Sequence, residues 1–158
     1  MSQMYVLKEG DTAPDFSMDA TNGRHVSLQG LKGQAFVLYF YPKADTPGCT
    51  KEACAFNDAL QAFDKTGLNI IGVSRDPMKK LESFSEKYGL AFPLASDADG
   101  QVTEAYGTWV EKSLYGKTYM GIERTTFLIN AEGKIARIWH KVKVDGHADA
   151  VVEAVSAL

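Results

Sequence analysis

The stretch AFVLYFYPKADTPGCTKEACAFNDALQAF, residues 35–63, contains the pattern that decides the fold. Residues 35–41 are apolar or aromatic without interruption, which is typical of a strand that is covered on both faces of a sheet. Pro42 ends this run, and the Thr-Pro-Gly sequence at 46–48 predicts a turn. Apolar residues then recur at three- and four-residue spacing, which predicts an amphipathic helix: Ala53, Phe56, Leu60 and Phe63. The stretch therefore predicts a strand, a turn and a helix in succession.

The rest of the chain continues the alternation of strands and helices. Asn22-Gly23 lies between alternating polar and apolar residues and is a strong hairpin signal. Gly67 is expected to end the first helix. Pro77 is expected to begin the second helix, and Gly89 is expected to end it. Further strands are predicted at 68–74, 92–97, 125–130 and 134–142, and helices at 77–89, 98–107 and 147–158. This order predicts an α/β protein with a mixed central sheet flanked by helices. It fits a thioredoxin-like fold with an N-terminal β-hairpin. We expect a single domain over residues 1–158.

The composition excludes several classes of function. The chain has 158 residues, of which 45% are hydrophobic and 23% are charged, so one ordinary globular domain is expected. A formal net charge of -3 provides no basic surface for nucleic acid. No apolar stretch approaches the roughly 18 residues that span a bilayer, and the N-terminus has no secretory signal. We therefore expect no nucleic-acid partner, no membrane partner and a cytoplasmic location.

The chain has two cysteines, Cys49 and Cys54. In a reducing compartment such a pair is more often catalytic, redox-sensing or metal-binding than structural. Cys49 is expected in the first turn of the helix after 46–48, where unpaired backbone N–H groups and the helix dipole favour negative charge. This position lowers the pKa of a thiol and raises the population of the nucleophilic thiolate. The alternative is a buried, inert cysteine in a helix cap.

The spacing of the two cysteines does not suit a permanent disulfide. Five residues of helix rise about 7.5 Å and turn the second side chain roughly 140° away from the first. The Cα atoms of a disulfide usually lie within about 7 Å of each other. Cys49 and Cys54 can therefore bond only after the helix opens, which would couple oxidation to a local conformational change. The spacing also differs from the Cys-x-x-Cys redox motif and from common zinc sites.

Several polar residues leave alternatives open. Glu52 either contributes to the electrostatics of the first helical turn or orients a nearby cation. The residues alone do not decide whether Arg75, Arg124 or Arg137 would serve a cysteine site. The Asp-Ala-Asp-Gly sequence at 97–100 predicts a turn that caps a helix, because it lacks the other ligands of a calcium loop. The three histidines lack the short spacing of metal ligands.

The region before Arg124 carries large side chains around a glycine-containing stretch: Trp109, Tyr115, Tyr119 and Met120. We expect these side chains to pack in the core. The alternative is that they line the wall of a site or form a surface for a partner.

The cysteine segment resembles the active-site pattern of the peroxiredoxins, Pro-x-x-x-Thr-x-x-Cys, here Pro42, Thr46 and Cys49. The second cysteine, within GCTKEAC, resembles the subgroup called PrxQ or bacterioferritin comigratory protein. Further blocks are similar to that family and follow in its order: GDTAPDFSMDATNG, NIIGVSRDP, SDADGQVTEAYGTW, KTYMGIERTTFLIN and GKIARIWHKVK. The resemblance therefore covers nearly the whole chain.

The resemblance implies a thiol peroxidase that reduces hydrogen peroxide and organic hydroperoxides. In that family the equivalent of Cys49 is the peroxidatic cysteine, whose thiolate becomes a sulfenic acid. The equivalent of Cys54 then resolves it as a transient intramolecular disulfide. Thr46 matches a threonine that hydrogen-bonds the thiolate and the peroxide, and Pro42 matches a proline that shields the sulfenic acid from water.

The resemblance also implies that Arg124 completes the site and that Glu52 holds this arginine. A guanidinium stays charged and makes several hydrogen bonds in fixed geometry, so it can stabilise the negative charge that passes from sulfur to oxygen. The expected reductant is thioredoxin, or in some members glutaredoxin, because the chain has no third cysteine. No cofactor and no metal are expected, and the chain is expected to be a monomer.

Two other functions are consistent with the cysteine pair. One is a general thioredoxin-like dithiol–disulfide oxidoreductase that acts on protein thiols. The other is a metal-binding module without enzymatic activity.

Overall fold

The main sheet runs through the middle of the molecule. The computed structural model describes residues 7–65 and 69–158, and within them the sheet has seven strands in the order β2-β1-β5-β4-β3-β8-β9. In that order the strands are Arg24–Ser27, Ser17–Ala20, Leu94–Ser96, Asn69–Ser74, Phe36–Phe40, Thr125–Ile129 and Ile135–Trp139. The helices are α1 (Pro47–Asp58), α2 (Leu60–Lys65), α3 (Met78–Tyr88), α4 (Gln101–Ala105) and α5 (His147–Ser156), with a 3-10 turn at Gln29–Leu31.

The sheet is mixed, as the sequence predicted. Strands β3, β4 and β5 are parallel, whereas β1 pairs antiparallel with β2 and β5, and β8 pairs antiparallel with β3 and β9. The predicted N-terminal hairpin is present, and Asn22 and Gly23 at its turn both have positive φ angles. The predicted α/β class and thioredoxin-like fold are therefore confirmed.

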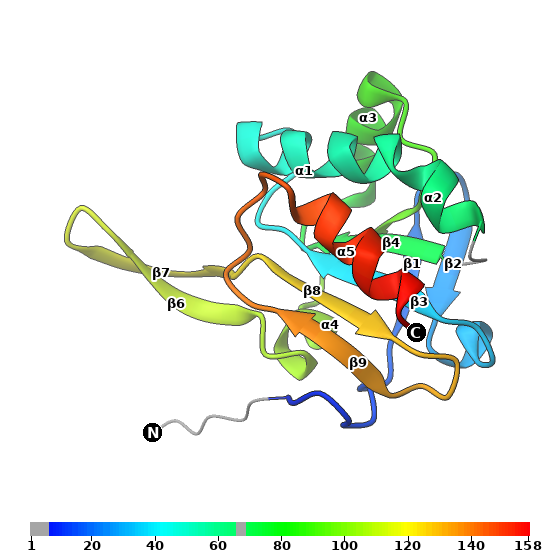
Figure 1. Ribbon diagram of the computed structural model, residues 1–158. Helices are drawn as coiled ribbons and strands as arrows, with labels where there is room; N and C mark the ends of the chain where they lie inside the picture. Colours follow the sequence, from blue (N-terminus) through cyan, green and yellow to red (C-terminus); the bar gives the residue numbers. More distant parts are fainter. Residues whose placement is uncertain (1–6, 66–68) are drawn as a thin grey trace.

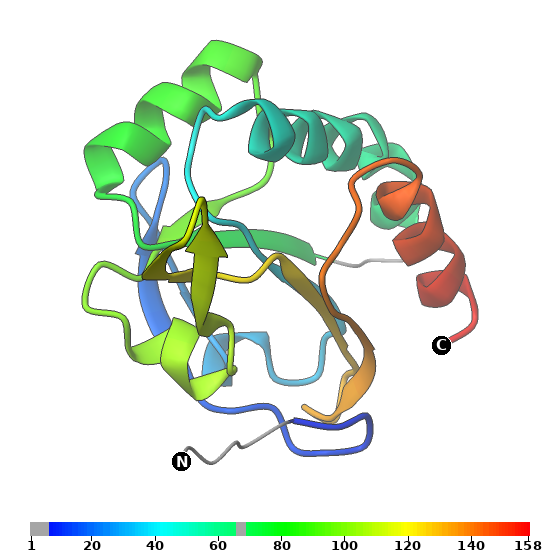
Figure 2. The same cartoon turned by 90° about the vertical axis from the view of Figure 1, so that its left-hand side faces the viewer.

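Strand β3 is fully buried because both faces of the sheet are covered. One set of its alternating side chains, which includes Val37 and Tyr39, packs under α1, α3 and α5. The other set, which includes Leu38 and Phe40, packs with α4 and the segment that leads into β1. Figures 1 and 2 show α4 on the opposite side of the sheet from α1, α3 and α5. This arrangement explains why residues 35–41 are continuously apolar.

An aromatic stack fixes α1 on the sheet. The ring of Tyr39 stacks on Phe56 of α1 with centroids 4.7 Å apart. Gly72 lies opposite Tyr39 on β4, and a Cβ atom there would come within 2.8 Å of the tyrosine ring. The absence of a side chain at Gly72 therefore lets Tyr39 lie flat beneath the helix.

Several helix boundaries differ from the predictions, among them those of α4, which spans Gln101–Ala105 and not 98–107. The helix predicted through Gly67 is divided at Ala59, which lies between α1 and α2 and has φ -87° and ψ -1°. Its predicted end at Gly67 and the predicted first residue of β4, Leu68, lie outside the described residues. Pro77 is the cap of α3 and not its first helical residue, because its ψ of 154° is extended. Gly89 ends α3 in the left-handed conformation, as predicted.

A second hairpin was not predicted. Strands β6 (Trp109–Leu114) and β7 (Lys117–Ile122) pair with each other, separately from the main sheet, and project away from it (Figure 1). Tyr115 and Gly116 form its two-residue turn, and both have positive φ angles. The prediction of core packing is wrong for Tyr115, Tyr119 and Met120, which are exposed, whereas Trp109 is half-buried.

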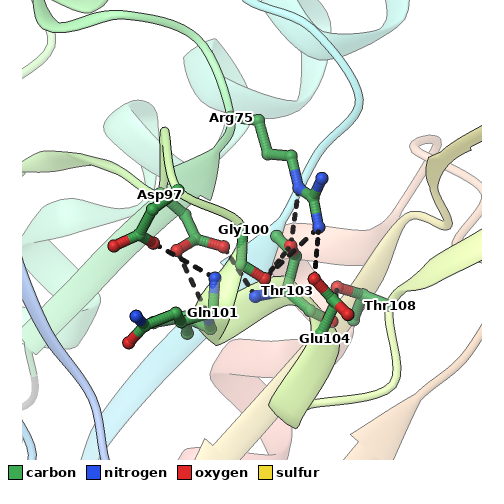
Figure 3. Close-up of polar contacts among 9 residues, drawn as sticks. Arg75, Asp97, Gly100, Gln101, Thr103, Glu104 and Thr108 are labelled. Atoms are coloured by element: carbon green, nitrogen blue, oxygen red, sulfur yellow. Dashed lines mark hydrogen bonds and ion pairs between the residues drawn. The ribbon is translucent and has the colours of Figure 1, made fainter.

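Arg75 packs at the base of this hairpin. Its guanidinium lies 3.4 Å from the centre of the Trp109 ring and bonds to Thr103 and Gly100 of the α4 region (Figure 3). Gly100 has a φ of +80°, which favours glycine, and a Cβ atom there would displace this guanidinium. Asp97 accepts hydrogen bonds from two backbone N–H groups at the start of α4, which confirms the predicted capping turn.

His147 begins α5 in a buried position. Its Nε2 atom lies 2.8 Å from the Thr126 hydroxyl on β8, and its ring packs edge-on against Phe56. Burial, assisted by the charge of Arg124, lowers the pKa of His147 to about 4. No helix among the described residues is long and apolar enough to cross a membrane.

We expect His147 to make stability depend on pH between about 4 and 6.5. The unfolded chain binds a proton at this histidine in that interval and the folded chain does not, so stability is lost as the pH falls. The loss at this residue amounts to at most about 3 kcal/mol. Denaturant unfolding of the wild type and of His147→Gln at pH 4 to 7 gives the free energy of unfolding at each pH. The slope of this free energy against pH should be smaller for the variant. His25→Gln, at an exposed histidine, is the control, and equal slopes for wild type and His147→Gln would contradict the assignment.

Candidate active site

Cys49 lies at the third position of α1, where the first turn meets the end of β3. Thr46 caps the helix and Pro47 is its first residue, so the helix begins two residues before the predicted start at Cys49, which still lies in the first turn. The backbone N–H groups of a first helical turn have no partner inside the helix, so this end carries partial positive charge. The side chain of Cys49 is buried, with 2% of the residue exposed. The thiol therefore lies at the positive end of α1 but in a protected position.

Arg124 contacts the sulfur directly. This arginine lies between β7 and β8, and its Nη2 atom is 3.3 Å from Cys49 Sγ. Its Nη1 atom donates a hydrogen bond of 2.6 Å to Glu52 Oε1, one turn further along α1 from Cys49. The guanidinium therefore bridges a thiol and a carboxylate from the same helix. The contact places a cation next to the sulfur, where it can stabilise negative charge that develops in a reaction.

Glu52 is a buried acid whose main contact is with the arginine. Burial raises the pKa of Glu52 to about 7, and the charge and hydrogen bond of Arg124 act in the opposite direction. Of the two interpretations of Glu52, the orientation of a cation fits the geometry, because the side chain is 1% exposed and faces Arg124 rather than solvent. The other carboxylate oxygen has no hydrogen-bond partner among the described residues.

The other arginines lie elsewhere. Arg75 is held at α4 and Trp109, and Arg137 lies over the ring of Trp139 and 3.8 Å from Glu9. Sequence alone could not choose among the three arginines, whereas the structure brings only Arg124 of these to Cys49.

Gly48 is a part of the site that the sequence reasoning did not single out. A Cβ atom at this position would lie 3.2 Å from Arg124 Nη2. A side chain at this position would therefore require the guanidinium to shift by a few tenths of an ångström. The signal in the sequence is the Pro-Gly pair itself, which predicts a turn.

Thr46 and Pro42 lie close to the cysteine in sequence, but their side chains make different contacts from those expected. The Thr46 hydroxyl donates a hydrogen bond of 2.8 Å to the carbonyl of Lys43. Among the described residues no hydrogen bond joins Thr46 to Cys49, although its oxygen lone pairs remain able to accept one. Pro42 is half-buried at the end of β3.

The loop between β3 and α1 is fastened to α3 and β4. Asp45, which has a positive φ of 61°, accepts hydrogen bonds from Lys87 and Tyr88 at the end of α3. The backbone N–H of Ala44 donates to the buried carboxylate of Asp76, at 2.7 Å. These contacts set the direction in which α1 leaves the sheet, and their side chains gave no signal in the sequence.

Cys54 is partly buried on α1, and both cysteines are free thiols. Burial, with a smaller effect of Asp58, raises the pKa of the Cys54 thiol. Lys51, between the two cysteines in sequence, forms an ion pair with Asp145 in the segment before α5. Both cysteines thus lie in an intact helix, and the segment between them is tied to other parts of the chain.

Lys112 is a second cation near the site that the sequence reasoning missed. Its stem passes over Gly121 on the neighbouring strand, where a Cβ atom would lie 3.3 Å from the lysine Cδ atom. Burial, and then the charge of Arg124, lowers the pKa of Lys112, whereas Glu123 and Cys49 raise it. Among residues 7–65 and 69–158, no three histidine, cysteine or acidic side chains are grouped as they would be to bind a metal.

Comparisons with known proteins agree with this fold. Residues 9–138 match the model of the AhpC/TSA family. A putative peroxiredoxin bcp of Coxiella burnetii is 51% identical over 146 residues, which are 92% of this chain and 97% of the relative. Peroxiredoxin Bcp of Escherichia coli K12 is 47% identical over 149 residues, or 94% and 96% of the two chains. A structure of Xanthomonas campestris peroxiredoxin Q superimposes with a TM-score of 0.86 at 47% identity and covers 90% of each chain.

A thioredoxin-like sheet that carries a cysteine at a helix N-terminus beside an arginine defines a thiol enzyme. The chain belongs to the AhpC/TSA family, and within it to the peroxiredoxins of the Bcp/PrxQ type. It is therefore a thiol peroxidase that reduces peroxides.

Replacement of Arg124 by alanine should slow the oxidation of Cys49 by about 100-fold, the effect expected when one charge-stabilising donor is lost. The rate is best measured in a Cys54→Ser background, so that one thiol reports. Arg137→Ala is the matched control, and an oxidation rate in Arg124→Ala equal to that of the wild type would refute the role of Arg124.

Proposed function

We propose that Cys49 is the peroxidatic nucleophile of this peroxidase and that Cys54 is its resolving partner. The observation that carries the proposal is the contact of Arg124 with the Cys49 sulfur, 3.3 Å long, made while the same guanidinium is bonded to Glu52. The resemblance assigns supporting roles to Thr46 and Pro42.

In the first step the Cys49 thiolate attacks one oxygen of the peroxide. An S–O bond forms as the O–O bond breaks, and the departing oxygen takes a proton and leaves as water or an alcohol. Cys49 is oxidised by two electrons to a sulfenic acid. Arg124 stabilises the negative charge as it moves from sulfur to oxygen, and the Thr46 hydroxyl, freed from Lys43 or used as an acceptor, orients the peroxide.

In the second step the Cys54 thiol attacks the sulfenic acid, and a disulfide forms with loss of water. This requires α1 to unwind between the two cysteines, because their spacing does not suit a disulfide within an intact helix. Unwinding breaks the ion pair of Lys51 with Asp145 and withdraws Glu52 from Arg124.

An external dithiol then reduces the disulfide, since the chain has no third cysteine. We propose thioredoxin as this reductant, with glutaredoxin as the second choice, and the cytoplasm as the compartment in which such reductants keep thiols reduced. The monomeric state that the family resemblance implies is part of the proposal. Hydrogen peroxide and organic hydroperoxides are the proposed substrates. A related Xanthomonas campestris structure was described for alkyl peroxide reduction.

Cysteine variants test the cycle. Cys49→Ser should abolish peroxide consumption, because the nucleophile is lost. Cys54→Ser should consume about one equivalent and then stall with thioredoxin as reductant, since no disulfide can form. Continuous turnover of Cys54→Ser with thioredoxin would rule out the resolving role.

Mass spectrometry of the wild type after one equivalent of peroxide gives an independent test. We expect the loss of two hydrogens and a link between the peptides of Cys49 and Cys54. A general dithiol oxidoreductase would instead reduce protein disulfides without consuming peroxide. A metal-binding module would retain stoichiometric zinc or copper through native purification.

A further inference from the structure

Most exposed large hydrophobic side chains gather on one hairpin. We call residues 109–122, the strands β6 and β7 with their turn, the arm. Leu114, Tyr115, Tyr119 and Met120 of the arm are between 49% and 95% exposed. Leu158, at the C-terminal end, is the fifth exposed large hydrophobic residue in the described part of the chain. A hydrophobic surface concentrated in one place on a soluble fold indicates an interaction site.

The arm is attached rigidly at its base and free at its tip. At the base, the backbone N–H of Glu123 donates to Thr108 at 2.7 Å, and Arg75 stacks on Trp109. Beyond the base the two strands pair only with each other in the described structure. Figure 1 shows the tip standing clear of the sheet and the helices. The outer edges of both strands are therefore open to a partner.

One face of the arm leads to the active site. The register places Lys112 opposite Tyr119 and Leu114 opposite Lys117, so these four side chains share a face, which we call the site face. Lys112 lies over Gly121 and within electrostatic reach of Arg124 and Cys49. The end of β7 continues through Glu123 into Arg124. The site face therefore runs from the tip of the arm toward the arginine that contacts the cysteine.

The site face combines apolar surface with unpaired positive charge. Within the described residues, neither Lys112 nor Lys117 forms a hydrogen bond or an ion pair. The chain as a whole carries a net charge of -3, so this face differs in sign from the molecule. A partner that complements it has apolar side chains with carboxylates beside them.

We propose that the site face of the arm is the docking surface for thioredoxin. This inference rests on the proposed function, in which an external dithiol must reach the disulfide of Cys49 and Cys54. In that exchange the thioredoxin dithiol is oxidised to a disulfide by two electrons, and both cysteines of this chain return to thiols. The arm offers a small surface, which suits the short-lived encounter that a redox partner makes. Its lysines steer an acidic partner toward the sulfur.

The test separates docking from chemistry by comparing two reductants. Turnover of hydrogen peroxide is measured with thioredoxin, thioredoxin reductase and NADPH, and separately with dithiothreitol, which needs no docking surface. The variants are Tyr119→Ser, which removes apolar surface, and Lys117→Glu, which reverses a charge. Leu158→Ser and Lys79→Glu are matched controls at exposed positions away from the arm.

We expect each arm variant to raise the KM for thioredoxin at least 5-fold, with kcat and the dithiothreitol rate unchanged within 2-fold. The controls should behave as the wild type. The KM for thioredoxin should rise with ionic strength in the wild type. It should rise less in Lys117→Glu.

Four outcomes would overturn the docking surface. The first is an unchanged KM for thioredoxin in both arm variants. The second is an equal loss with thioredoxin and with dithiothreitol, which would make the arm part of the site itself. The third is a dimeric wild type in sedimentation whose arm variants are monomers with unchanged KM, which would make the partner a second copy. The fourth is turnover with dithiothreitol but not with thioredoxin in the wild type, which would refute this surface and leave the peroxidase intact. Absence of both would refute the proposed cycle.

Discussion

The guanidinium of Arg124 makes the two contacts on which the site depends. It reaches the sulfur of Cys49 with one nitrogen and the buried carboxylate of Glu52 with another. A lysine could not make both contacts in the same geometry, because its ammonium is a single point of charge. The carboxylate keeps the arginine in place, and the arginine keeps a charged carboxylate tolerable in a buried position. The pair also holds the first turn of α1 against the end of β7.

The fold brings these residues together from distant parts of the chain. Cys49 and Arg124 are 75 positions apart, and they meet because β3 and β8 are neighbours in the sheet. Strand β3 delivers the helix start, and the residue just before β8 delivers the arginine. The stack of Tyr39 on Phe56 and the loop contacts of Asp45 and Asp76 then fix the helix. Packing contacts that lie outside the thiol site therefore position its residues.

The sequence predicted the elements whose signals are local, and it failed where the structure depends on distant partners. The βαβ order, the Asn22-Gly23 hairpin and the capping by Asp97 follow from period and turn chemistry, and all are present. The β6–β7 hairpin was missed because Tyr115-Gly116 is a weaker turn signal than Asn-Gly, and its large side chains suggested a core. The choice of Arg124 over Arg75 and Arg137 needed the family resemblance, because a guanidinium on its own says nothing about its neighbours. No sequence pattern indicated a role for Lys112. Its side chain passes over Gly121, which has no side chain of its own.

The contacts of α1 also suggest how oxidation and unwinding are coupled in the proposed cycle. While Cys49 is a thiolate, its attraction to Arg124 adds to the hold of Glu52 and keeps the first turn of the helix closed. Conversion to a sulfenic acid removes that negative charge, so the charge-assisted contact becomes an ordinary one, which is roughly half as strong. The exposed ion pair of Lys51 with Asp145 contributes little resistance, because solvent screens it. The helix is therefore most firmly held before the reaction, when Cys49 must stay protected, and less firmly after it, when Cys54 must approach.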